Sequence, residues 1–222
     1  YGFLLQYLRA GDIRYWQIGD QAARHYRDVD VIHHSTNPYF VGAPRAHNTK
    51  HVVEDGWYPD HNLGGVSVHH AWAEGLWLHY LITGDELTHE AARGASDWFA
   101  AEVERDRWFR GGVERGPGWA LVALIGSYRA TSDEKYLQAA QDIANDVYLR
   151  QDPIRGVFSV PVDGRPSYEG GQSFMSGILA RGMARLCVET GDPRAALATA
   201  RFHEWLTREM RVDATRFIYK QA

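Results

Sequence analysis

Apolar residues recur along most of the chain at the spacing of one helix face. The clearest run follows Asp133, where the apolar and small positions are Tyr136, Leu137, Ala139, Ala140, Ile143, Ala144 and Val147. A repeat of about 3.6 residues is typical of an amphipathic helix packed against a core. The pattern therefore predicts helices and no strand.

One short motif occurs four times and marks where helices end and begin. The copies are Tyr7–Asp12, Tyr80–Asp85, Tyr128–Asp133 and Cys187–Asp192. Each closes an apolar run at Gly, or once at Ser132, and continues with Asp. A left-handed residue can end a helix, and an Asp side chain can accept from the free N–H groups of the next one. The motif predicts an all-α protein of four helical hairpins.

Long links separate the hairpins, at about residues 28–67, 105–116 and 151–171. If the hairpins pack side by side, all long links share one rim and all short corners the other. Links of this length usually carry function. We therefore expect the functional site on the rim of the long links.

The corners, together with Asp60–Leu76 (DHNLGGVSVHHAWAEGL), resemble the α/α toroid (barrel) of carbohydrate-active enzymes. Within that group the chain is most similar to exo-type rhamnogalacturonan lyase-like proteins, bacterial enzymes of uronic-acid polysaccharides. The resemblance implies a polysaccharide or oligosaccharide substrate and a β-elimination lyase. No complete catalytic motif matches, so no residue role is carried over. We expect one toroid domain over residues 1–222, incomplete because four hairpins leave the ring open.

Eight of the eleven histidines lie between residues 33 and 79, mostly in the first link. A uronate lyase needs a base for the proton next to the carboxylate and an acid for the leaving oxygen. His70 and Glu74 are one helical turn apart and can act together. The candidate catalytic residues are His47, Tyr58, His69, His70 and Glu74. A satisfied polar pair in the core and a solvated loop are the structural alternatives.

Aromatic and charged residues near the same rim could bind a sugar. Arg can pair with a uronate carboxylate, and Trp can stack on a sugar ring. The candidate substrate-binding residues are Arg45, His51, Trp57, His61, Trp72, Arg115, Trp119 and Glu169. Core packing is the competing interpretation for Trp72, and a plain surface loop for Glu169.

Two other functions use the same residues. A glycoside hydrolase on this fold would need two carboxylates, for which Asp60, Glu74 and Glu169 are available. A non-catalytic sugar-binding helical repeat protein would need none.

A metal site is an alternative interpretation of His47, His51, Asp60 and His61, whose imidazole and carboxylate groups suit a transition metal. The chain has neither a Cys pair nor an HExxH motif. We therefore expect no cofactor, with a divalent metal as the alternative.

Net charge and hydropathy exclude some classes of binding partner. Twenty-four Lys and Arg against 28 Asp and Glu give a net charge of −4, without a basic stripe. We expect neither nucleic acid nor a membrane as partner. No signal peptide is recognisable, the substrate class favours an extracellular or periplasmic location, and the oligomeric state is not predicted.

Overall fold

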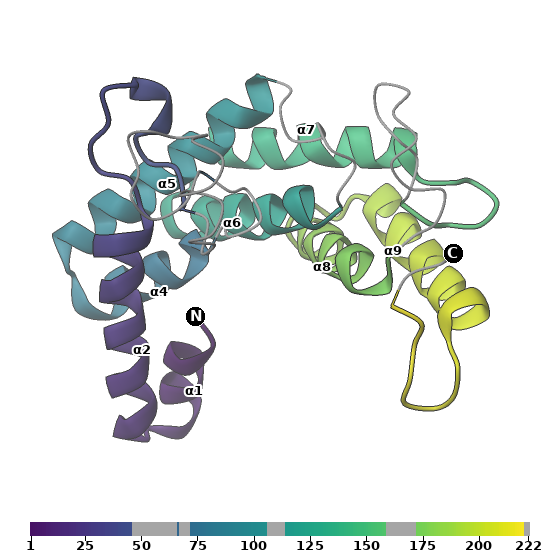
Figure 1. Cartoon of the computed structure of the whole chain (residues 1–222), viewed down its shortest axis with the longest axis horizontal. Helices are drawn as coiled ribbons and strands as arrows, with labels where there is room; N and C mark the ends of the chain where they lie inside the picture. The colour runs from purple at the N-terminus through teal and green to yellow at the C-terminus, as the bar shows by residue number, and fades with distance from the viewer. Residues whose placement is uncertain (46–65, 67–71, 106–113, 159–171, 220–222) are drawn as a thin grey trace, which may run out of the picture. The chain divides into compact units, whose positions relative to one another are not determined.

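The computed structural model describes residues 1–45, 66, 72–105, 114–158 and 172–219 (Figure 1). Within these residues the only β-structure is a set of isolated bridges. The long helices form pairs in chain order, which confirms the predicted helical hairpins. They are α1 (Gly2–Ala10) and α2 (Ile13–His25), α4 (Ala73–Thr83) and α5 (Glu86–Glu104), α6 (Arg115–Thr131) and α7 (Glu134–Arg150), and α8 (Ser173–Thr190) and α9 (Pro193–Trp205). Short helical segments follow α2 and α9, namely η1 (Tyr26–Asp30) and η4 (Leu206–Met210), and η2 spans Pro38–Phe40.

The chain folds as two compact units. Unit 1 comprises residues 1–101 and 126–136, and unit 2 comprises residues 102–125 and 137–222. One toroid domain over the whole chain remains a prediction.

The four corners have the geometry that the repeated motif predicts. The backbone is left-handed at Gly11, Gly84, Ser132 and Gly191, with φ of 67°, 68°, 56° and 69°. At the second corner, the Thr83 hydroxyl donates to the His79 carbonyl at 2.8 Å and accepts from the Asp85 N–H at 3.1 Å. Thr131 and Thr190 make the same two bonds at the next two corners. The side chain therefore carries the hydrogen bonding across each of these reversals.

A buried polar cluster aligns three helices of unit 1. The indole N–H of Trp77 in α4 donates to the hydroxyls of Ser96 in α5 and Ser127 in α6, both at 3.0 Å. The two hydroxyls lie 2.7 Å apart, and Ser96 also donates to the Ala92 carbonyl at 2.6 Å. Since buried polar atoms are costly unless paired, this cluster favours one register of the three helices.

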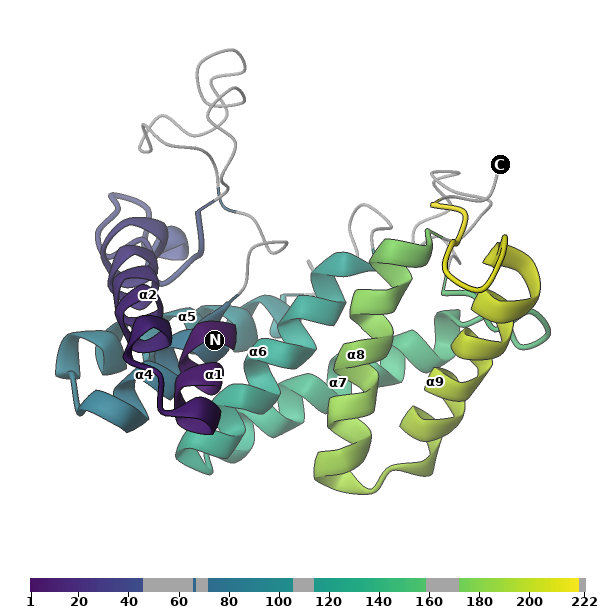
Figure 2. The same cartoon turned by 90° about the horizontal axis from the view of Figure 1, so that it is seen from below.

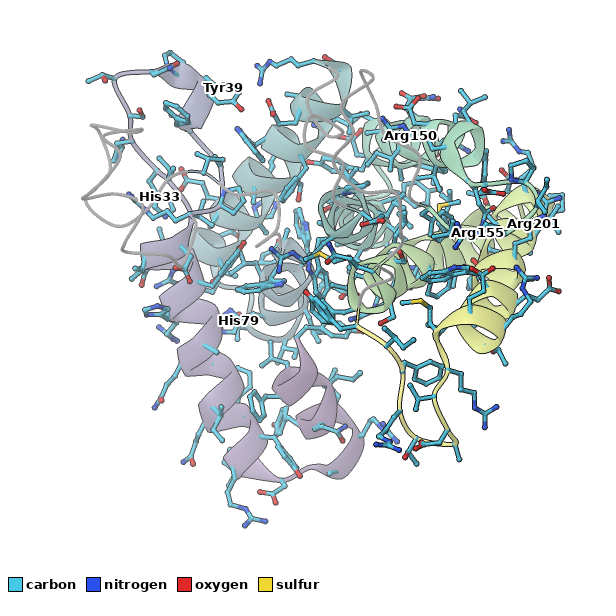
Figure 3. All side chains as sticks on the ribbon, turned by 45° about the vertical axis from the view of Figure 1, so that its right-hand side comes forward. His33, Tyr39, His79, Arg150, Arg155 and Arg201 are labelled. Atoms are coloured by element: carbon cyan, nitrogen blue, oxygen red, sulfur yellow. The ribbon has the colours of Figure 1, made fainter. Side chains whose placement is uncertain are left out.

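His79 joins α4 to the first hairpin. Its side chain is fully buried, and Nε2 lies 2.8 Å from Asp20 Oδ1 in α2 (Figure 3). The ring stacks on Trp16 with centroids 5.9 Å apart. His79 therefore belongs to the packing of unit 1.

Arg27 ties the end of the first hairpin to the start of α5. Its Nη1 donates to Asp85 Oδ2 at 2.8 Å, and its Nε donates to Asp28 Oδ1 at 2.6 Å. Asp85 Oδ1 also accepts from the backbone N–H groups of Leu87 and Thr88. One carboxylate thus caps α5 and pairs with a buried guanidinium.

Glycines allow α6 and α8 of unit 2 to approach closely. A Cβ on Gly118 would lie 2.6 Å from the backbone nitrogen of Leu179, and one on Gly182 would lie 2.7 Å from Leu121 Cβ. The next helix, α9, runs back along α8 from the corner at Gly191 (Figure 2). Gly118 and Gly182 are thus required by the close approach of the two helices.

Replacing Asp85 with Ala should destabilise the protein by about 2–3 kcal/mol, because it removes a cap and a partner of a buried charge. Asp12→Ala is the matched control, since Asp12 caps α2 and pairs with Arg14, which is exposed. Urea denaturation should give a loss of about 1 kcal/mol for Asp12→Ala. Equal losses for the two variants would contradict the role given to Arg27.

Gly118→Ala should destabilise the protein by about 1–3 kcal/mol, because the new methyl group meets the backbone of α8. Gly177 lies in α8 with open space around its Cα, so Gly177→Ala should stabilise by about 0.5–1 kcal/mol. Thermal unfolding of the two variants measures both effects. A stabilised Gly118→Ala protein would refute the close approach.

Candidate functional site

The candidate residues from the sequence fall into three groups. Nine lie outside the described residues, namely His47, His51, Trp57, Tyr58, Asp60, His61, His69, His70 and Glu169. Arg45, Trp72 and Glu74 lie in unit 1, and Arg115 and Trp119 lie in unit 2. The described members all lie at or near a helix start or in the first link, where the rim was expected.

Trp72 stands immediately before α4 and is exposed, with 41% of its surface accessible. Its backbone N–H donates to the Tyr26 hydroxyl at 3.2 Å, and the two rings lie 5.8 Å apart. Burial raises the pKa of the Tyr26 hydroxyl, which therefore stays protonated. The interpretation of Trp72 as a core residue is wrong, because its side chain is exposed at the start of α4.

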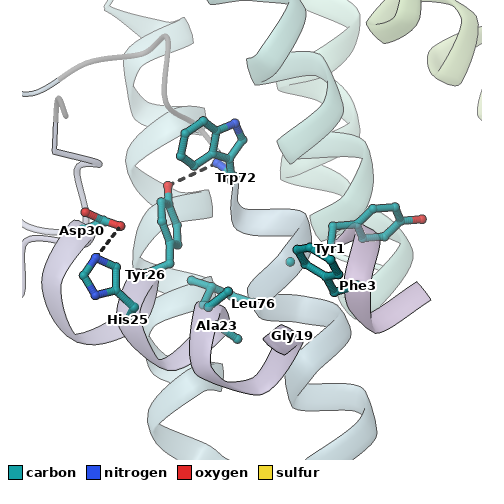
Figure 4. A pocket seen from close by; sticks show the side chains of 11 residues that line it. Tyr1, Phe3, Gly19, Ala23, His25, Tyr26, Asp30, Trp72 and Leu76 are labelled. Atoms are coloured by element: carbon teal, nitrogen blue, oxygen red, sulfur yellow. Dashed lines mark hydrogen bonds and ion pairs between the residues drawn. The ribbon is translucent and has the colours of Figure 1, made fainter. Parts of the chain in front are cut away.

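A cavity of about 420 Å³ opens beside Trp72, between α1, α2 and α4 (Figure 4). Phe3, Ala23 and Leu76 form part of its apolar lining, and its polar groups include His25 and Asp30. The volume and the mixed lining are those of a small-ligand site.

Asp30 lines this cavity, and the backbone of Arg45 pairs with the backbone of Asp30. Asp30 is 5% exposed, and one carboxylate oxygen lies 3.9 Å from His25 Nε2. The Arg45 N–H donates to the Asp30 carbonyl at 2.7 Å. Arg45 Nε is buried and makes no hydrogen bond to any residue that the structure describes. The first link therefore pairs with this buried acid through the backbone of Arg45.

Glu74 lies in the first turn of α4, between the cavity residues Trp72 and Gly75. A Cβ on Gly126 in α6 would lie 3.2 Å from both Cβ and Cγ of Glu74, so the stem of the side chain packs on α6. The proposed partner of Glu74, His70, is outside the described residues. Their pairing remains a prediction.

In unit 2 a buried acid precedes the first turn of α6. Glu114 is 8% exposed, and its carbonyl accepts the first helical bond from Gly118 at 3.1 Å. Burial raises the pKa of the Glu114 carboxyl to about 7, although its own backbone N–H and the nearby Ser176 hydroxyl act in the opposite direction. Ser176 Oγ is itself buried and forms no hydrogen bond of ordinary geometry within the described part of the chain. Glu114 can therefore carry a proton near neutral pH.

Arg115 and Trp119 follow Glu114 along α6, and both are half-buried. The guanidinium of Arg181 lies 5.6 Å from the centre of the Trp119 ring and covers one of its faces. Only the other face of this indole could accept a sugar ring.

Four residues of these sites are not predicted from the sequence, namely His25, Tyr26, Asp30 and Glu114. For Glu114 a signal was available, because an acid directly before Arg115 and Gly116–Gly118 stands at the start of a helix that follows a long link. The other three lie before or at the start of the first link, and they share a cavity with Trp72 only because the first hairpin packs on α4.

The described residues contain no group of three His, Cys, Asp or Glu side chains suited to a metal. The alternative ligands His47, His51, Asp60 and His61 lie outside those residues, so the metal site remains untested.

Among the residues that the structure describes, no helix is long and apolar enough to cross a bilayer.

Comparison with solved structures confirms the α/α-toroid fold. The chain aligns with an unsaturated glucuronyl hydrolase from Streptococcus agalactiae with a TM-score of 0.67 and 14% identity, covering 92% of this chain and 48% of that one. An α-1,6-mannanase of Salegentibacter sp. HEL1_6 gives 0.62 and 14%, covering 89% and 52%. A polysaccharide lyase gives 0.57 and 15%, covering 99% and 61%. The chain thus spans about half the length of the solved structures it resembles.

A search of curated proteins finds no match. The family of β-L-arabinofuranosidase catalytic domains, GH127, has a model that matches residues 9–212, or nearly the whole chain. The chain belongs to this family.

Proposed function

We propose that the protein is a glycoside hydrolase in which Glu114 is the proton donor. The observation that carries the proposal is the buried carboxyl of Glu114, at the start of α6, with its pKa raised to about 7. Family membership over residues 9–212 supports hydrolysis as the reaction class.

Cleavage of a glycosidic bond requires a proton on the leaving oxygen and a carboxylate or equivalent group on the other side of the sugar. An acid with a pKa near the working pH is the most effective donor. A variant of the mannanase of the same fold, in which two aspartates are replaced by alanine, is inactive. For the second group in this chain, Glu74, Asp60 and Glu169 remain the candidates.

A terminal β-L-arabinofuranosyl residue is the substrate that the family match favours. Within unit 1, the exposed indole of Trp72 beside the 420 Å³ cavity is suited to bind a sugar ring, and Asp30 offers an acceptor for a hydroxyl group. Tyr26 holds the backbone of Trp72 in place.

Glu114→Gln should lower hydrolysis of an unactivated arabinofuranoside by about 10²–10⁴-fold, the usual contribution of a general acid. On a p-nitrophenyl arabinofuranoside the loss should be much smaller, because that leaving group needs no proton. Steady-state kinetics of the full-length protein on both substrates measure the difference.

Glu204→Gln is the matched control, because Glu204 is an exposed acid of α9 and should leave both rates unchanged. The fall in rate above about pH 7 should also disappear in Glu114→Gln. Equal losses on the two substrates, or an unchanged pH profile, would show that Glu114 is not the proton donor.

The same carboxyl should make stability depend on pH. Its pKa is higher in the folded protein than in the unfolded chain, where it is 4.5, so its contribution is complete below pH 4.5 and is lost as pH rises through about 7. Between pH 5 and pH 8 the wild type should lose about 2–3 kcal/mol relative to Glu114→Gln. Urea denaturation at the two pH values measures this, and a constant difference would contradict the burial of the acid.

A uronate lyase is the second candidate, supported by the likeness to a polysaccharide lyase over 99% of this chain. In that case His47, His69 or His70 would be the base, Arg45 would neutralise the uronate, and Tyr58 would be the acid. Elimination leaves a carbon–carbon double bond that absorbs ultraviolet light, and hydrolysis does not. Incubation with rhamnogalacturonan should release reducing ends without that absorbance if the protein is a hydrolase acting on it, whereas a rise in absorbance would establish the lyase.

A further inference from the structure

A second hollow lies in unit 1 at the far end of α4 from Trp72. It has a volume of about 360 Å³, and its lining includes Trp77, Tyr80, His89, Arg93, Asp133 and Tyr136. These residues come from α4, α5, the corner after α6 and the first turn of α7. We call it the corner hollow. The first cavity is lined by α4 residues up to Leu76 and the corner hollow by α4 residues from Trp77 onward, so the two cavities share no residue of this helix.

Aromatic rings form one side of the corner hollow. The rings of Tyr80 and His89 are stacked, with centroids 4.6 Å apart and an angle of 25° between them. The Trp77 ring meets the His89 ring edge-on at 5.6 Å. Its indole N–H is already bonded to Ser96 and Ser127, which fixes the ring in place. A rigid aromatic wall of this kind suits the apolar face of a sugar ring.

Charged groups on the other side are balanced in sign. Asp97 accepts from the Tyr136 hydroxyl at 2.8 Å and pairs with Lys135 Nζ at 2.8 Å. Lys135 also reaches Asp133 at 3.2 Å. Asp97 and Lys135 thus contact residues of the lining, whose own charged members are one cation, Arg93, and one anion, Asp133. A balanced lining favours a neutral ligand with many hydroxyl groups over an anion or a cation.

Arg93 is the group most available to such a ligand. Its side chain is 61% exposed, and its nearest carboxylate among the described residues, Asp97, lies 3.9 Å away. That distance is too long for a hydrogen bond. Because Asp97 is held by Lys135 and Tyr136, the guanidinium keeps its donors for another partner.

We propose that the corner hollow is a non-catalytic binding site for a neutral sugar unit of a glycan, with Arg93 as donor and the Tyr80–His89 stack as platform. The choice of a glycan rests on the proposed function. The site itself lies at the opposite end of α4 from the proposed substrate cavity, so it would hold a part of the glycan that is not being cleaved or a second chain.

The indole N–H signals of Trp77 and Trp72 can report on the two cavities separately. We would titrate the full-length, ¹⁵N-labelled Glu114→Gln protein with L-arabinose and with a linear arabino-oligosaccharide, and follow both signals by NMR. The corner site predicts a saturable shift of the Trp77 signal. Arg93→Ala should weaken the affinity measured from that shift by about tenfold or more, the usual effect of a lost charged hydrogen bond.

Arg24→Ala is the matched control, because Arg24 is an exposed arginine of α2 that pairs with Asp20 one turn away. It should leave the Trp77 shift unchanged. Ala130→Phe fills the hollow from α6 and should abolish the shift, with the wild-type melting temperature as the test of folding.

Two results would overturn the corner site: a Trp77 signal that does not move with either sugar, or equal affinities in Arg93→Ala and wild type. Failure of the proposed function is distinguishable, because a protein without glycosidase activity that still shows the Trp77 shift and its loss in Arg93→Ala retains the corner site.

Discussion

The reversal of the chain at a left-handed residue followed by a capping aspartate is the constraint on which the structure depends. At Gly84, Ser132 and Gly191 a threonine hydroxyl joins the last turn of one helix to the first residue of the next. Because each reversal is this tight, the two helices of a hairpin must lie side by side and antiparallel. The long links then have to arrive at the opposite helix ends, which leaves those ends open to carry a site.

Acidic residues at the two ends of the hairpins differ in the direction in which their pKa values are shifted. Corner aspartates such as Asp85 and Asp192 accept from backbone N–H groups and arginine, and these partners lower their pKa despite some desolvation. Glu114 also stands at a helix start, where the dipole favours an anion by at most about 1–2 kcal/mol. Burial outweighs this contribution, because a pKa of about 7 corresponds to about 3 kcal/mol in favour of the protonated form. Depth, and not position in the helix, makes this acid a candidate proton donor.

The histidine cluster illustrates how residue type can mislead without packing. His79 belongs to the stretch rich in histidine, yet it is fully buried against Asp20 and Trp16. His33 Nε2 lies 2.6 Å from the Arg27 carbonyl. Both rings are engaged in local structure. Conversely, Asp30 is not predicted as a site residue from the sequence. Nothing near it in the chain indicates that it lines the same cavity as Trp72.

The sequence by itself determined the all-α class and the four hairpins, because helix periodicity, left-handed termination and aspartate capping act within a few residues. It also predicts a site at the helix ends that the long links join, with Arg45, Trp72, Arg115 and Trp119 near those ends. Only the tertiary structure decided that Trp72 is exposed, that Glu114 is buried, and that α6 and α8 touch at Gly118. Burial depends on residues far away in the chain, and burial is what changes the chemistry of a carboxyl group.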